Sequence, residues 1–283
     1  MRVPSGWLVR RTAFINWFDP VVITSQKAAH GDFQTPPALA RAVCRLVQQF
    51  IQAPASIVEP TCGVGGLLIA AADAFPGAPR VQGYELSADY TAQSQRIIAQ
   101  RPDAARFAIA EQDYFTADWR TLRAEWPSPL LLIGNPPWVT NAQLSALGSD
   151  NLPVKANTAQ LKGLDALTGK SNFDISEWML HDMIGWLPGR QATLAMLVKT
   201  AVARKVLRHA WAEKMPLTRA AIYEIDAKQH FAAAVDACLL LVQCDPNAAP
   251  APATCPVFAS LTAAEPRAVL AYTDGLLLAD ARP

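Results

Sequence analysis

Leu130-Leu131-Leu132-Ile133-Gly134-Asn135-Pro136-Pro137-Trp138 is the stretch that decides the fold. Four large apolar residues in a row are typical of a strand that is buried on both faces at the centre of a sheet. Asn135 and two prolines follow at once, and a proline cannot continue a central strand because it has no N–H to donate. The stretch therefore predicts a central strand that ends in a rigid polar turn.

Short apolar runs and helical patterns alternate on both sides of this strand. The other predicted strands are residues 56–59, 81–86, 106–110, 192–198, 219–225 and 237–243. Helices are predicted at 37–50, 67–75, 89–100 and 201–213, and after a capping box at 171–174. This order predicts an α/β fold, a doubly wound and mostly parallel sheet of seven strands. Because the last two strands have no helix between them, one antiparallel strand is expected near the end.

Composition restricts the classes of protein to which the chain can belong. Of its 283 residues, 51% are hydrophobic and 17% are charged, which excludes a disordered chain. No apolar run approaches the roughly 20 residues of a membrane span, and the N-terminus lacks the pattern of a secretory signal. The five cysteines are an odd number without CxxC spacing, so they predict neither a disulfide framework nor a zinc site. A cytoplasmic protein without a membrane partner is expected.

Charge is unevenly distributed along the chain. The net charge is only +1, yet residues 190–219 contain seven Lys or Arg and one acid. Such a stretch is either a solvated helix or a basic face that holds phosphates.

Two segments interrupt the alternation of strands and helices. Residues 139–170 are polar and poor in strand signal, which is typical of a functional or disordered loop. Residues 246–254 form a Pro/Ala linker, and the later Asp274-Gly275 is typical of a hairpin turn. The predicted parts are an N-terminal extension (1–30), the main domain (31–245), the linker (246–254) and the start of a truncated C-terminal region (255–283).

A glycine-containing turn joins the strand at 56–59 to the helix that follows. It reads Glu59-Pro60-Thr61-Cys62-Gly63-Val64-Gly65-Gly66. Glycines let the backbone pass close to a ligand, and the N-terminus of a helix offers N–H groups. The same glycines could serve only to pack the helix. The turn is neither a Walker loop nor a complete dinucleotide fingerprint.

Acidic residues end the next two strands. Glu85 lies 26 residues after Glu59, where a carboxylate can accept hydrogen bonds from both ribose hydroxyls of a nucleoside. Asp113 and Tyr114 follow the third strand, and such a pair can hold an adenine amino group and cover its ring. Taken alone, each acid is better explained as a solvated residue at the end of a strand.

The turn Asn135-Pro136-Pro137-Trp138 carries the sharpest chemical signal. Its two prolines fix the backbone and remove two donors, so carbonyl oxygens are expected beside the Asn135 side-chain oxygen. An amino group that enters there meets two acceptors, and Trp138 provides a flat stacking surface. The carboxyl end of a central strand is also where α/β sheets bind ligands.

These motifs, in this order, resemble those of the class I AdoMet-dependent methyltransferases, and more narrowly those of the γ-type amino DNA methyltransferases. The matching segments are 31–37 (GDFQTPP), 59–65, Glu85, Asp113-Tyr114, Asn135 to Trp138 and His230-Phe231. In that family the last of these motifs supplies an aromatic ring that packs on the target base. A core phenylalanine is the alternative for Phe231.

The resemblance implies AdoMet as the cofactor and the N6 amine of adenine in double-stranded DNA as the methyl acceptor. The implied cofactor-binding residues are Thr35, Pro36, Glu59, Thr61, Cys62, Gly63, Gly65, Glu85, Leu86, Asp113 and Tyr114. The implied catalytic residues are Asn135, Pro136, Pro137, Trp138 and Phe231. It further implies that the base is flipped out of the duplex and sandwiched between Trp138 and Phe231. Direct attack by its amine needs neither a metal nor a covalent intermediate.

Other readings of the same motifs remain open. The acceptor could be cytosine N4, the N2 amine of guanine in RNA, or a protein glutamine amide, because all are flat conjugated amines. A non-catalytic subunit that binds the cofactor or DNA is the alternative outside the enzymes. A role in restriction-modification or a related defence system is expected. The DNA sequence would then be read by another subunit or by a C-terminal domain.

Overall fold

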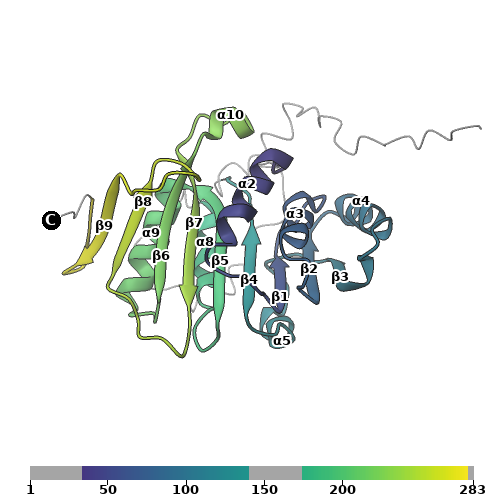
Figure 1. Cartoon of the computed structure of the whole chain (residues 1–283), viewed down its shortest axis with the longest axis horizontal. Coiled ribbons are helices and arrows are strands. Elements are labelled where there is room, and N and C mark those ends of the chain that lie inside the picture. The colour runs from purple at the N-terminus through teal and green to yellow at the C-terminus, as the bar shows by residue number, and fades with distance from the viewer. Residues whose placement is uncertain (1–33, 140–173, 280–283) are drawn as a thin grey trace, which may run out of the picture.

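The computed structural model describes residues 34–139 and 174–279, which form a ten-stranded sheet with helices on both faces (Figure 1). The strands lie in the order β10-β9-β8-β6-β7-β5-β4-β1-β2-β3. Their bounds are β1 (Ser56–Glu59), β2 (Arg80–Glu85), β3 (Phe107–Glu111), β4 (Leu130–Gly134), β5 (Ala192–Lys199), β6 (Arg219–Ile225), β7 (Ala237–Cys244), β8 (Thr254–Phe258), β9 (Ala268–Thr273) and β10 (Leu276–Leu278). The α/β class is confirmed, and the seven predicted strands correspond to β1 through β7.

The helices also occur where the apolar spacing predicts them. Their bounds are α2 (Pro37–Val47), α3 (Gly66–Ala74), α4 (Ala88–Ala99), α5 (Trp119–Ala124), α8 (Ile175–Ile184), α9 (Thr200–Ala212) and α10 (Ala227–Phe231), with a 3-10 turn at η1 (Ala104–Arg106). Asp174, from the predicted capping box, is the N-cap of α8 and accepts a hydrogen bond from the Ser176 N–H at 3.0 Å. The predicted helices are thus confirmed as α2, α3, α4, α8 and α9.

Both faces of the central strands are buried, as the run of apolar residues in β4 predicts. Leu130 and Leu132 belong to a hydrophobic cluster that includes residues of α8 and α9. Leu131 and Ile133 belong to a second cluster that includes residues of α2 and α3. Because side chains alternate along a strand, this arrangement places one pair of helices on each face of the sheet.

The direction of the strands brings their carboxyl ends to one edge. β1 pairs in parallel with β2 and β4, β2 pairs in parallel with β3, and β4 pairs in parallel with β5. β7 lies between β5 and β6 and is antiparallel to both, which confirms the antiparallel strand expected near the end. The residues that follow β1, β2, β3 and β4 therefore gather at the same edge of the sheet.

The three strands after the Pro/Ala-rich segment extend this sheet. β8 pairs in parallel with β6, β9 pairs with β8, and β10 pairs with β9. The predicted hairpin is confirmed, because Asp274 and Gly275 connect β9 to β10 with φ values of +51° and +81°. Pro256 lies within β8. Because proline argues against a strand, the sequence pattern did not predict β8.

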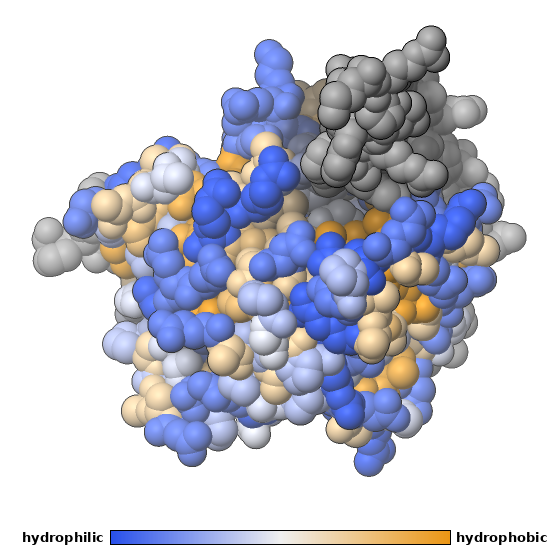
Figure 2. Space-filling view, turned by 45° about the vertical axis from the view of Figure 1, so that its right-hand side comes forward, coloured by the Kyte–Doolittle hydropathy of each residue, from blue (hydrophilic) through white to orange (hydrophobic). Residues whose placement is uncertain are grey.

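Several predictions concern residues outside the described ones. They are the N-terminal extension at 1–30, the role of the segment at 139–170 beyond Val139, and the first three residues of the capping box. Within the described ranges, no helix has the length and apolarity needed to cross a membrane. On the face drawn in Figure 2, hydrophilic residues predominate and hydrophobic residues form small patches between them.

Gly83 in β2 offers a test of how tightly this part of the core is packed. A Cβ atom at this position would lie 2.8 Å from Cys62 Sγ, 2.8 Å from Ile109 Cδ1 and 2.9 Å from Leu68 Cδ2. We predict that Gly83→Ala lowers the free energy of unfolding by about 1–3 kcal/mol, because the added methyl group overpacks the core. Denaturant-induced unfolding measures the effect.

Gly77→Ala is the matched control, because a Cβ there meets no described atom within 4 Å. Equal free energies of unfolding for the two variants would contradict the packing seen around β2.

Candidate functional site

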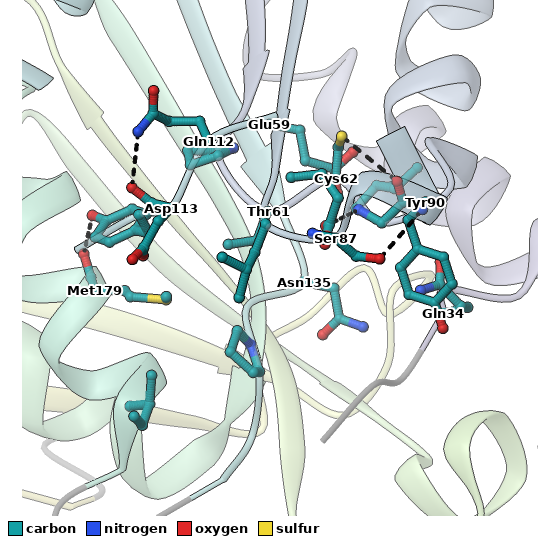
Figure 3. A pocket seen from close by; sticks show the side chains of 18 of the residues that line it. Gln34, Glu59, Thr61, Cys62, Ser87, Tyr90, Gln112, Asp113, Asn135 and Met179 are labelled. Atoms are coloured by element: carbon teal, nitrogen blue, oxygen red, sulfur yellow. Dashed lines mark hydrogen bonds between the residues drawn. The ribbon is translucent and has the colours of Figure 1, made fainter. Parts of the chain in front are cut away.

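A cavity of about 400 Å³ lies at the carboxyl ends of β1, β2, β3 and β4. Figure 3 shows side chains from these strand ends pointing into it. The predicted site residues that line it are Thr35, Glu59, Thr61, Cys62, Gly63, Glu85, Leu86, Asp113, Tyr114, Asn135 and Pro137. Those that do not line it are Pro36, Gly65, Pro136, Trp138 and Phe231. Motifs up to about a hundred residues apart in sequence therefore meet at one place.

The turn between β1 and α3 forms one wall of the cavity. Gly63 and Gly65 have φ values of +54° and +85°, which favour glycine. A Cβ on Gly63 would lie 2.6 Å from the Gln34 amide oxygen, so a side chain there would displace the end of the Gln34 side chain. The glycines thus allow Gln34 to pack directly on the backbone of the turn.

The Glu85 carboxylate holds this turn against the end of β2. Its Oε2 accepts a hydrogen bond from the Gly63 N–H at 2.8 Å, and its Oε1 accepts one from the Ser87 N–H at 2.8 Å. Hydrogen bonds to a charged acceptor are roughly twice as strong as those between neutral groups. Glu85 therefore fixes the relative positions of two segments that line the cavity.

Glu59 brings a second carboxylate to the same edge, and it is only 2% exposed. Burial raises the pKa of the Glu59 carboxyl well above its usual value; the Leu68 N–H opposes this shift and the charge of Glu85 adds to it. Glu59 Oε2 is buried and accepts no hydrogen bond from any described residue. A buried acceptor that faces a cavity favours a ligand with hydrogen-bond donors or positive charge.

Cys62 lines the cavity as a small neutral residue. Burial, with the charges of Glu59 and Glu85, raises the pKa of the Cys62 thiol well above its usual range. A thiol that stays protonated is a poor nucleophile.

Asp113 and Tyr114 form the wall contributed by the end of β3. Asp113 Oδ1 accepts a hydrogen bond from the Phe115 N–H at 2.9 Å. The Tyr114 hydroxyl lies 3.2 Å from the Met179 carbonyl oxygen and 3.1 Å from Asp182 Oδ2. The Tyr114 ring is 4% exposed and belongs to the core cluster that includes α8 residues. Tyr114 is therefore a rigid part of the wall, held by α8.

The turn after β4 places Asn135 in the wall of the cavity. The Asn135 amide nitrogen donates a hydrogen bond to Thr35 Oγ1 at 3.4 Å. Pro137 and Val139 also line the cavity, whereas Pro136 is buried. The Val139 carbonyl oxygen accepts a hydrogen bond from the Ile175 N–H at 2.9 Å, so this turn is also tied to the start of α8.

The sandwich of a base between Trp138 and Phe231 stays a prediction, and it requires these two rings to move apart. The two rings contact each other edge to face, with 5.0 Å between their centroids and 73° between their planes. Trp138 is 4% exposed and donates a hydrogen bond from Nε1 to the Leu197 carbonyl oxygen at 3.1 Å. Because α10 places Phe231 directly on this ring, the pair leaves no room for a base between them.

Some lining residues were not predicted from the sequence. They are Gln34, Pro60, Gly66, Leu67, Ser87, Tyr90, Gln112, Phe115, Val139, Ile175 and Met179. Most of them neighbour a predicted residue in sequence and could have been found from that alone. Ile175 and Met179 come from α8, and no sequence signal connects that helix with the cavity.

Three of the seven Lys or Arg residues at 190–219 lie on α9. Arg204, Lys205 and Arg208 are exposed there. Lys205 pairs with Glu177 at 2.7 Å, and Lys199 before the helix pairs with Asp174 at 2.7 Å. Two of these positively charged side chains therefore form ion pairs that connect α9 to α8.

The chain is similar in sequence to the Type II methyltransferase M.NspV of Nostoc sp. (strain ATCC 29411 / PCC 7524). The two are 41% identical over 223 residues, which are 79% of this chain and 46% of M.NspV. The chain thus spans about half the length of this relative. No family model matches the chain.

Solved structures share the fold. One is a Listeria monocytogenes protein described as a class I S-adenosylmethionine-dependent methyltransferase, with a TM-score of 0.58, 16% identity, and coverage of 81% of this chain and 67% of that one. Another is the type I restriction-modification methyltransferase subunit of Streptococcus thermophilus, with a TM-score of 0.52 and 12% identity. That match covers 80% of this chain and 47% of the other.

Glu59 makes the stability of the protein depend on pH. Its pKa is raised in the folded chain, so the unfolded chain releases this proton at lower pH than the folded chain does. The protonated Glu59 carboxyl contributes fully to the stability of the folded chain below the ordinary carboxyl pKa. This contribution is lost as the pH rises toward the raised pKa of Glu59 in the folded chain. We predict that Glu59→Gln becomes increasingly stable relative to the wild type above about pH 4.5, by up to about 1.4 kcal/mol per pH unit.

Unfolding curves between pH 5 and pH 8 measure this difference. Glu111→Gln, at an exposed position in β3, is the control that changes the charge by the same amount. The prediction fails if the stability of Glu59→Gln and that of the wild type change in parallel with pH.

Proposed function

The chain belongs to the class I AdoMet-dependent methyltransferases, and on that premise we propose that it methylates the N6 amine of adenine in double-stranded DNA. The observation that carries the proposal is the position of Asn135, from the turn after β4, beside a cavity lined by Glu59, Glu85 and Asp113. The 41% identity to a type II methyltransferase supports DNA as the substrate. Restriction-modification, or a related defence system, is the proposed setting.

The cavity residues fit AdoMet. When bound, AdoMet supplies an electrophilic methyl group on a positively charged sulfur. Glu59 Oε2 is a buried acceptor with no hydrogen bond from the described residues, and Glu85 and Asp113 add two further carboxylates along the same edge. Such a set suits the ammonium, ribose hydroxyl and adenine amino donors of this cofactor. Thr61 adds a hydroxyl group to the polar lining.

Asn135 and Pro136 have the chemistry that an amine acceptor requires. An exocyclic amine is a weak nucleophile because its lone pair is delocalised into the ring. Acceptance of its two hydrogens by Asn135 Oδ1 and the Pro136 carbonyl oxygen favours a pyramidal, more nucleophilic nitrogen. The same two oxygens stabilise the positive charge that develops on this nitrogen as it takes the methyl group.

A base inside a duplex cannot reach this site, so it has to be extruded. Trp138 is the proposed stacking surface for the extruded base. Because Phe231 rests edge to face on Trp138, a base that stacks there has to displace Phe231 and with it the end of α10. In this proposal the two rings are in contact only when no base is bound.

Sequence recognition is proposed to reside outside the catalytic residues. In the family that the motifs resemble, a C-terminal region or a separate subunit reads the DNA. The Streptococcus thermophilus structure that shares the fold is itself described as a subunit of a type I system. We propose the same division of labour for this protein, with double-stranded DNA as the shared partner.

The direct test uses isotopically labelled AdoMet with unmethylated plasmid DNA, total RNA and a protein extract in separate reactions. Mass spectrometry of the digested DNA is expected to find labelled N6-methyladenine. We predict that Asn135→Ala lowers its rate of formation by about a hundredfold or more, because the lost oxygen acts on charge in the transition state. Asn247→Ala, in an exposed turn, is the matched control and should leave the rate unchanged.

The other outcomes separate the competing functions. Labelled N4-methylcytosine would keep DNA as the substrate and change the base. Label confined to RNA or to protein would overturn the DNA proposal. No label in any of the three would favour the non-catalytic subunit.

A further inference from the structure

We propose that Thr35 is a positioning residue that sets the orientation of the Asn135 side-chain amide. The inference rests on the proposed function, in which Asn135 Oδ1 accepts a hydrogen from the target amine. Its basis is one contact, the hydrogen bond that Asn135 Nδ2 donates to Thr35 Oγ1 at 3.4 Å. These two residues are a hundred positions apart and meet at the wall of the cavity.

An asparagine amide needs a partner to choose between its two orientations. The oxygen and the NH2 group occupy nearly the same space, but one accepts hydrogen bonds and the other donates them. A target amine presents hydrogens, so an inverted Asn135 would meet it with donors instead of an acceptor. The Thr35 hydroxyl oxygen accepts from Nδ2, which favours the orientation that turns Oδ1 away from Thr35.

Thr35 is placed on a rigid support. It precedes Pro36 and Pro37, and a residue before proline is restricted to an extended backbone. The Pro36 carbonyl oxygen accepts the Ala40 N–H at 2.9 Å, which starts α2. The inner face of α2, including Val43 and Val47, is fully buried in the core. The backbone at Thr35 therefore leads directly into a helix that is anchored in the core.

The residue before Thr35 is anchored as well. The Val64 N–H donates to Gln34 Oε1 at 3.4 Å, and the Gln34 amide packs where a side chain on Gly63 would otherwise lie. The segment Gln34-Thr35 thus contacts the β1–α3 turn through one residue and Asn135 through the next. This arrangement places the Thr35 hydroxyl between the β1–α3 turn and Asn135.

Thr35→Val tests the proposal, because valine keeps the shape of threonine and removes the acceptor. We expect kcat for DNA methylation to fall roughly five- to tenfold, the value of one ordinary hydrogen bond. The KM and the equilibrium dissociation constant for AdoMet should change less than about twofold. Thr35→Ser, which restores the hydroxyl, should return kcat to within about twofold of the wild type.

Thr91→Val is the control for the same chemical change elsewhere. The Thr91 hydroxyl is buried in α4 and has no hydrogen-bond partner among the described residues. Its replacement should leave kcat unchanged. If Thr35→Val instead weakens AdoMet binding with kcat intact, Thr35 is a cofactor contact and the proposal is overturned. Wild-type kinetics in Thr35→Val would overturn it equally.

A second measurement does not depend on turnover. The side-chain amide signal of Asn135 in a ¹⁵N NMR spectrum is assigned as the one that disappears in Asn135→Ala. We expect this signal to shift in Thr35→Val and to return in Thr35→Ser. An unmoved signal would contradict the proposal even in an active enzyme. Conversely, if the wild-type protein leaves DNA unlabelled while the signal still shifts in Thr35→Val, only the proposed function is overturned.

Discussion

The bridge made by the Glu85 carboxylate is the interaction on which the rest of the site depends. Its two oxygens accept the N–H groups of Gly63 and Ser87, each at 2.8 Å. Gly63 belongs to the turn after β1, and Ser87 is the N-cap of α4 after β2. One side chain therefore fixes the turn that carries Thr61 and Cys62 relative to the neighbouring strand.

The sequence was most informative where its pattern determines the burial and the direction of the strands. The apolar run in β4 required burial on both faces, and both hydrophobic clusters include its residues. Strands separated by helices had to be parallel, so Glu59, Glu85 and Asn135 had to lie at one edge. Those three residues do line the same cavity. The position of these residues in the sequence was sufficient here, because parallel pairing puts the carboxyl ends of neighbouring strands at the same edge of the sheet.

The sequence was least informative about where side chains point. Nothing in the pattern of Asn135 to Trp138 shows that the Trp138 ring turns inward to the Leu197 carbonyl and meets Phe231. Met179 reaches the cavity from α8, which follows a segment whose path the sequence does not reveal. Both features arise from packing between distant elements. Local periodicity carries no information about such contacts, whereas a neighbour such as Gln34 could have been inferred from the adjacent Thr35.

AdoMet binding by Glu85→Gln tests the central claim most directly, because glutamine keeps the size of the side chain and removes its charge. Calorimetry should show affinity at least tenfold below that of the wild type, since a hydrogen bond to a charged group contributes about 1.5–3 kcal/mol. Glu111→Gln, at the position in β3 that pairs with Glu85, is the control and should bind normally. A Glu85→Gln variant that folds and binds AdoMet as tightly as the wild type would contradict the account.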